Sequence, residues 1–140
     1  MNIDQTVRYG KNWVPTEQQR MYCRHQSGDS LKDTAESLVA GKRPRPDRLN
    51  YIRAVSMFVK DNISYEETGS FPQQADYTLE KAESGNCVDQ SVLLMSLLEA
   101  LDIDARYCCY VRDGKEVGHC LIEVRVPNAD RHPSRVERRL

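Results

Sequence analysis

Apolar residues recur at helical spacing in three stretches of the chain. Residues 29–40 carry an apolar stripe that ends at Gly41, so we expect a first helix there. Residues 47–62 repeat this spacing and predict a second helix. The stretch from Cys87 to Leu101 is the most apolar of the three, and its pattern predicts a helix that packs into the core.

Two later stretches have the composition of β-strands. Residues 105–111 and 117–126 are rich in aromatic and β-branched side chains, and Asp113-Gly114 between them is typical of a hairpin turn. We therefore expect an antiparallel sheet against which the Cys87 helix packs. An extended piece, a polar loop and one or two helical turns are expected before that helix, at residues 63–65, 66–76 and 78–82.

The two ends of the chain are patterned more weakly. Residues 1–46 are interpreted as an irregular arm, docked through Trp13-Val14-Pro15, followed by the first helix. Residues 47–127 form the core, and residues 128–140 form a basic tail. The basic, proline-containing linker at 41–46 is interpreted as a solvated connector in preference to a nucleic-acid contact.

Charge and length exclude several classes of protein. The chain has 140 residues, enough for one domain with a proper core. Lys and Arg number 20 against 21 Asp and Glu, so the net charge of −1 gives no overall attraction to nucleic acid or to membranes. The N-terminus lacks the apolar core of a signal peptide, and no apolar run is long enough to span a membrane. We expect a cytoplasmic protein.

The cysteines do not form a disulfide or zinc framework. There are five of them, at positions 23, 87, 108, 109 and 120. The number is odd, and the chain holds neither a C-x-x-C pair nor an H-x-x-x-H pair. We therefore expect thiols in a reducing compartment, with no metal and no cofactor. Adjacent Cys108 and Cys109 are interpreted as packing residues.

Cys87 stands out because of the turn that precedes it. Gly85 is expected to supply backbone freedom, and Asn86 is a favourable N-cap residue. A thiol in the first helical turn faces the positive end of the helix dipole, which favours the thiolate, and the same amides can receive an oxyanion. The alternative is that Cys87 is a small core hydrophobe, the usual role of a buried cysteine.

A histidine on the second predicted strand favours the catalytic interpretation of Cys87 over the packing interpretation. His119 is the one histidine of three that falls in a predicted core element, since His25 lies in the arm and His132 in the tail. Nucleophilic catalysis by cysteine needs an imidazole within hydrogen-bond reach and a third group that holds its tautomer. A helix start packed on a sheet can bring Cys87 and His119 together.

Six short segments recur here in the order seen in the transglutaminase-like superfamily. They are Val59–Tyr65, Thr78-Leu79, Gly85–Asp89, Leu93–Leu98, Ile103–Tyr107 and Gly118–Val124. The resemblance covers residues 47–127. It implies a papain-like α+β fold, in which a nucleophile helix packs on a small antiparallel sheet and a Cys-His-Asp triad performs the chemistry.

The resemblance also implies a role for each site residue. Cys87 corresponds to the nucleophile and His119 to the general base. Asp130 is the only aspartate after His119, but it comes earlier than the family's third residue. Either Asp130 orients His119 through a shortened connection, or the orienting residue is missing, or the domain continues beyond this chain. Tyr65 is interpreted first as a packing residue and second as a site residue.

Three hypotheses for function follow. The first is a cysteine peptidase, amidase or acyl-transferase that acts on a peptide or protein amide through a Cys87 thioester. The second is an inert transglutaminase-like fold that serves as a binding or scaffold module. The third is a thiol redox or metal protein that uses Cys108, Cys109 and Cys120. The first is preferred, and substrate, acceptor and oligomeric state do not follow from the sequence.

Overall fold

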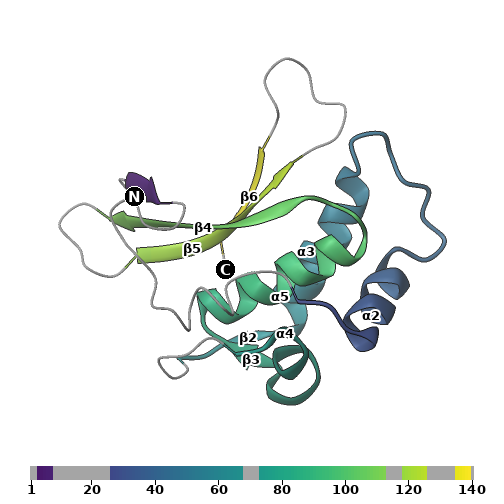
Figure 1. Ribbon diagram of the computed structural model, residues 1–140, viewed down its shortest axis with the longest axis horizontal. Helices are drawn as coiled ribbons and strands as arrows, with labels where there is room; N and C mark the ends of the chain where they lie inside the picture. The colour runs from purple at the N-terminus through teal and green to yellow at the C-terminus, as the bar shows by residue number, and fades with distance from the viewer. Residues whose placement is uncertain (1–2, 8–25, 68–72, 113–117, 126–134, 140) are drawn as a thin grey trace.

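Helices gather on one face of an antiparallel sheet (Figure 1). The structure is a computed structural model that describes residues 3–7, 26–67, 73–112, 118–125 and 135–139. In chain order, its elements are β1 (Ile3–Val7), α2 (Asp29–Val39), α3 (Leu49–Asn62), β2 (Ser64–Tyr65), α4 (Ala75–Tyr77), the π-helix η1 (Thr78–Ala82), β3 (Ser84–Gly85), α5 (Cys87–Ala100), β4 (Ala105–Arg112), β5 (Gly118–Arg125) and β6 (Arg135–Arg139).

The larger sheet has four strands in the order β1-β4-β5-β6, and every neighbouring pair is antiparallel. Strands β4 and β5 pair without a shift in register from Ala105 opposite Val124 to Val111 opposite Gly118. The predicted antiparallel pairing of these two stretches is therefore confirmed. The proposed turn at Asp113-Gly114 lies outside the described residues.

One edge of this sheet comes from the arm that was expected to be irregular, and the other comes from the weakly patterned basic tail. Strand β1, at residues 3–7, pairs with β4, and β6, at residues 135–139, pairs with β5. The expectation of an irregular arm is wrong for residues 3–7, because a short edge strand is stabilised by pairing with a distant partner. Trp13-Val14-Pro15 lies outside the described residues, and the division of the chain at residues 46/47 and 127/128 stays a prediction.

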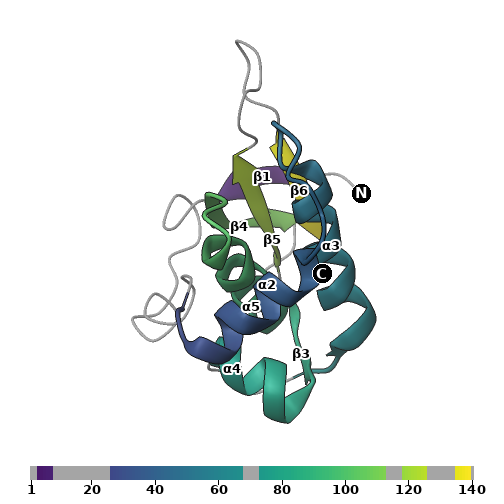
Figure 2. The same cartoon turned by 90° about the vertical axis from the view of Figure 1, so that its right-hand side faces the viewer.

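Helix α5 is the central element of the fold. It contacts β4 and β5 on one side and α2 and α3 on the other, so it lies between the sheet and the remaining helices (Figure 2). Ten consecutive residues, 89–98, are buried, which is a helix buried on every side and not only along a stripe. Ile122 and Val124 of β5 meet it in the same core. The predicted packing of the Cys87 helix on the sheet is confirmed.

Helices α2 and α3 have nearly the predicted bounds. Helix α3 begins at Leu49, two residues later than expected, because Arg48 adopts a left-handed conformation with φ of 60°. The carboxylate of Asp47 accepts a hydrogen bond from the Leu49 amide at 3.1 Å and so satisfies one donor at the helix start. Helix α2 buries Leu31, Ala35 and Val39 against the core, as their spacing predicts.

A second, two-stranded sheet lies beside the start of α5. Strand β2 pairs in parallel with β3, so Ser64 lies opposite Ser84 and Tyr65 opposite Gly85. The connection between these strands contains α4 and the π-helix η1, where one or two helical turns were predicted. This small sheet brings the segment after α3 against the turn that leads into Cys87.

Candidate functional site

Cys87 is the first residue of α5, and a capping box surrounds it. The side-chain oxygen of Asn86 accepts hydrogen bonds from the amides of Val88 and Asp89, both at 3.0 Å. The carboxylate of Asp89 returns a bond, accepting from the Asn86 amide at 3.0 Å. This reciprocal arrangement fixes the start of the helix, and therefore the backbone of Cys87, in one conformation.

Gly85 is required for a different reason from the one predicted. Its backbone is not in the left-handed region, so the expectation of special backbone freedom is wrong. A Cβ at position 85 would instead lie 2.6 Å from the Cβ of Asp89 and 3.0 Å from a carboxylate oxygen of the same residue. Glycine therefore allows the incoming chain to pass close to Asp89.

Asp89 connects the cysteine turn to a segment earlier in the chain. Its side chain is fully buried, and its second oxygen accepts a hydrogen bond from the Gln73 amide at 2.6 Å. Gln73 in turn accepts a hydrogen bond from the Thr78 hydroxyl at 2.9 Å. Asp89 is thus a positioning residue whose long-range partner the sequence did not reveal, although Asn86-x-x-Asp89 is a capping-box pattern.

Gln90 attaches the two-stranded sheet to α5. Its side-chain amide donates to the carbonyl of Gly85 at 3.0 Å and to that of Ser64 at 3.4 Å. The Glu66 amide also donates to the Gly85 carbonyl, at 3.1 Å. The Gly85 carbonyl therefore accepts two hydrogen bonds, one from α5 and one from the residue after β2. No sequence signal indicated this role of Gln90, because a glutamine in a buried helix has no characteristic spacing.

Tyr65 lies at the surface beside this turn and is not a core residue. Its side chain is 57% exposed, and its hydroxyl donates to the carboxylate of Glu67 at 2.7 Å. This hydrogen bond is the main cause that raises the pKa of Tyr65 to about 12, followed by partial burial and by the negative charges of Cys87, Glu67 and Asp89. The packing interpretation is wrong, because the Tyr65 side chain is exposed.

The far end of α5 is also capped. The guanidinium of Arg48 donates to the carbonyl of Leu101 at 2.7 Å and lies 4.9 Å from the centre of the Tyr51 ring. A cation at the C-terminal end of a helix is favourable because it complements the macrodipole. Both ends of the helix that carries Cys87 are therefore bound to side chains.

The Cys87 side chain is partly buried and packs against the main core. His119 lies in β5, where its backbone is opposite Tyr110 of β4, and β5 contacts α5. The position of its ring is outside the description, and so is the whole of Asp130. The Cys-His-Asp triad consequently stays a prediction.

Other cysteines fall on the central strands. The register places Cys109 directly opposite Cys120 across β4 and β5, and Cys108 opposite Leu121. Cys23 lies outside the described residues. Within the described part of the chain, no three His, Cys, Asp or Glu side chains come together as metal ligands.

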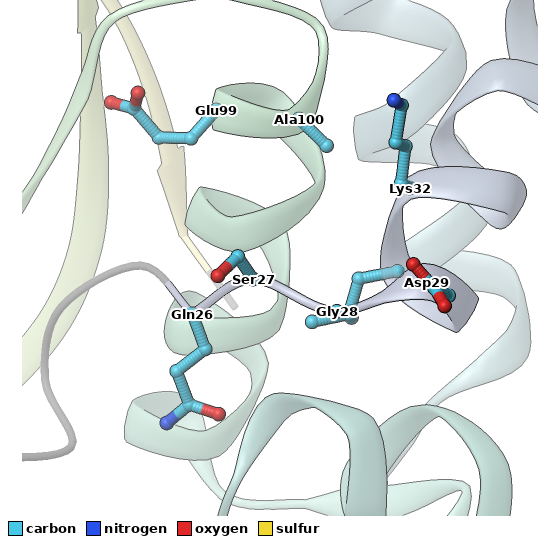
Figure 3. A pocket seen from close by; sticks show the side chains of 8 residues that line it. Gln26, Ser27, Gly28, Asp29, Lys32, Glu99 and Ala100 are labelled. Carbon is cyan, nitrogen blue, oxygen red and sulfur yellow. The ribbon is translucent and has the colours of Figure 1, made fainter.

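A hollow of about 440 Å³ lies between the start of α2 and the end of α5, away from Cys87 (Figure 3). Its labelled side chains point in different directions. The carboxylate of Glu99 is turned to the start of β4, where it accepts a hydrogen bond from the Ala105 amide at 3.0 Å. The hollow does not present a convergent set of groups.

A buried helix that begins with a cysteine and packs on an antiparallel sheet is the arrangement of a papain-like α+β fold. The chain belongs to the transglutaminase-like superfamily, whose family model matches residues 32–131. No curated protein matches the chain. In the ranges that the structure covers, no helix is both long enough and apolar enough to cross a membrane.

Three solved structures share this fold. A candidate cysteine protease from Cytophaga hutchinsonii is 18% identical, with a TM-score of 0.63 over 88% of this chain and 42% of that one. The periplasmic domain of TgpA from Pseudomonas aeruginosa, bound to ethylmercury, is 15% identical, with a TM-score of 0.59 over 92% and 50%. A candidate protease from Parabacteroides distasonis is 13% identical, with a TM-score of 0.54 over 85% and 29%. The chain spans half or less of these proteins, and the likeness shows the fold.

Proposed function

We propose that this protein is a thiol-dependent enzyme that cleaves an amide bond of a peptide or protein through a thioester on Cys87. The observation that carries the proposal is the placement of Cys87 at the first position of a helix whose start is fixed by Asn86 and Asp89. The family supports it, as do two structural neighbours that are candidate proteases.

The chemistry would proceed in two steps. In the first, the Cys87 thiolate, favoured by the helix N-terminus, attacks the amide carbonyl, and the tetrahedral oxyanion collapses to a thioester as the amine leaves. His119 gives that amine its proton. In the second, His119 takes a proton from water, which attacks the thioester and releases the acid and the thiol. An amine in place of water would give transfer, and hydrolysis is the simpler of the two.

The oxyanion would be received at the start of α5. The amides of Val88 and Asp89 donate to Asn86. We assign the oxyanion to amides at the start of the helix, including that of Cys87, which lies next to the attacking sulfur. Tyr65 keeps its proton at neutral pH because its pKa is about 12, and it can act as a second donor if it turns from Glu67.

Neither the substrate nor the cellular location follows from the family or the fold alone. A peptide or protein amide is proposed because two of the structural neighbours are candidate proteases. The cytoplasmic location also stays a prediction, since one structural neighbour is a periplasmic domain. Nucleic acid and membranes are not proposed as partners of this site.

The proposal is tested by the reactivity of Cys87. Iodoacetamide should alkylate it at mildly acidic pH, where ordinary thiols with a pKa of about 8.5 react slowly. Peptide mass mapping over a pH series should show Cys87 modified ahead of the four other cysteines. The reason is that a helix N-terminus and a neighbouring imidazolium both favour the thiolate.

The matched control is the same protein in urea, in which all five cysteines should titrate alike. If Cys87 titrates in the folded protein as it does in urea, then the thiol is not activated. In that case, the transglutaminase-like fold serves as a binding or scaffold module.

A further inference from the structure

A strongly basic segment lies at the other end of the molecule from Cys87. Residues 42–53 contain five Lys or Arg and one Asp, a net charge of 5 − 1 = +4, in a chain whose total is −1. The segment comprises the linker between α2 and α3 and the first turn of α3. It is located at the side of the molecule where α5 ends, whereas β2 and β3 lie where α5 begins (Figure 1).

The linker is held in place by side chains of α3. The Asn50 side chain donates to the carbonyl of Arg43 at 2.7 Å and accepts from the amide of Arg45 at 3.3 Å. The Tyr51 hydroxyl donates to the carbonyl of Lys42 at 3.0 Å. Two prolines restrict the backbone between these contacts. The basic side chains therefore extend from a backbone that is held in one conformation. This lowers the conformational entropy that is lost when a ligand binds.

Between the linker and α3 is a groove of about 320 Å³. The aliphatic floor of the groove consists of Leu49, Ala54 and Met57. Its cationic rim consists of Lys42, Arg45 and Arg53. Met57 is 48% exposed, unusually high for a large apolar side chain. The carboxylate of Asp47 lies 3.7 Å from Arg45 and accepts a hydrogen bond from the Leu49 amide, and no acidic side chain is among the described residues that line the groove. The rim therefore keeps a positive excess.

We propose that this groove binds an acidic peptide segment of a partner protein, with an apolar side chain of that segment seated on Met57. The rim supplies charge complementarity, and a methionine floor adapts to different apolar side chains. A nucleic acid fits less well, because the residues that line the groove include no aromatic ring on which a base could stack.

The groove is distinct from the thiol site. Arg48, within the same basic segment, contacts the carbonyl of Leu101 just past the end of α5, and Cys87 is the first residue of that 14-residue helix. A helix of this length spans about 21 Å. The groove therefore binds its peptide independently of whether Cys87 is catalytic, and the proposal does not rest on the proposed activity.

Fluorescence anisotropy with a labelled peptide tests the proposal. The probe is an eight-residue peptide that alternates Glu with Leu, compared with the same peptide carrying Gln for Glu and with a single-stranded DNA of equal charge. Wild-type protein should bind the Glu peptide and not the Gln peptide. Arg53→Glu should weaken binding about tenfold, because it places like charges in the groove.

Two further variants complete the design. Lys32→Glu changes the net charge equally but lies on the exposed face of α2, where Lys32 is 3.9 Å from Glu36, and it should leave the affinity unchanged. Met57→Glu should also weaken binding, because it replaces the apolar floor with a carboxylate that repels the acidic peptide. Thermal unfolding of each variant confirms that it is folded. Equal weakening by Lys32→Glu, binding of the Gln peptide, or binding of DNA alone would overturn the proposal.

Discussion

Replacement of His119 by alanine is expected to slow acylation of Cys87 by p-nitrophenyl acetate about 10²- to 10⁴-fold. The thiolate attacks the acetyl carbonyl, a thioester forms, and p-nitrophenolate leaves. Without the imidazole, the thiol loses the base that removes its proton and the cation that stabilises the thiolate. Release of p-nitrophenolate and an acetyl group on Cys87 by mass spectrometry measure the rate.

The matched control is His132→Ala, because His132 is a histidine of the tail to which no role in the chemistry is assigned. Its acylation rate should equal that of the wild type. Asp130→Ala distinguishes an orienting residue from a turn residue, since an orienting residue lowers the rate and a turn residue does not. If His119→Ala and His132→Ala acylate at the same rate, His119 is not the general base.

The second large effect concerns the buried carboxylate under the cysteine turn. Asp89→Ala should lower the free energy of unfolding by about 2–4 kcal/mol, because the amides of Asn86 and Gln73 would both lose their acceptor. Asp89→Asn keeps one acceptor oxygen and should have a smaller effect. Urea denaturation monitored by circular dichroism gives these values.

Asp33→Ala is the control for this series, since Asp33 lies on the exposed face of α2. Its effect should stay within about 0.5 kcal/mol. In the same variants, alkylation of Cys87 reports on the site: Asp89→Ala should remove the advantage of Cys87 over the other thiols under folding conditions. Unchanged stability of Asp89→Ala would show that the carboxylate does not hold the turn.

The helices and the central strand pair could be predicted because their signals are local. Three apolar repeats define α2, α3 and α5, and β-rich composition on both sides of Asp113-Gly114 indicates β4 and β5. Strands β1 and β6 could not be found in this way. Each has five residues, and each is stabilised by backbone pairing with a strand elsewhere in the chain.

The same distinction between local and long-range signals applies to the candidate site. The helix start at Asn86 was predicted because capping depends on residues three apart in sequence. The hydrogen bond from Gln73 to Asp89 and the exposure of Tyr65 depend on segments that meet through space, and the close approach of Gly85 to Asp89 depends on the conformation of the turn between them. A single sequence does not contain these distances. Family resemblance supplied the role of His119, and it supplied none of the supporting contacts.

The pairing of β1 with β4 has a consequence for synthesis of the chain. Residues 3–7 leave the ribosome long before their partners, residues 109–112, are translated. Until then, β1 must remain unpaired, and closing so long a loop carries an entropic cost that grows with its length. Helix α5 and the helices it contacts can pack earlier, because they are complete by residue 100. Strand β1 can therefore join the fold only after β4, more than a hundred residues later in the chain, has been made.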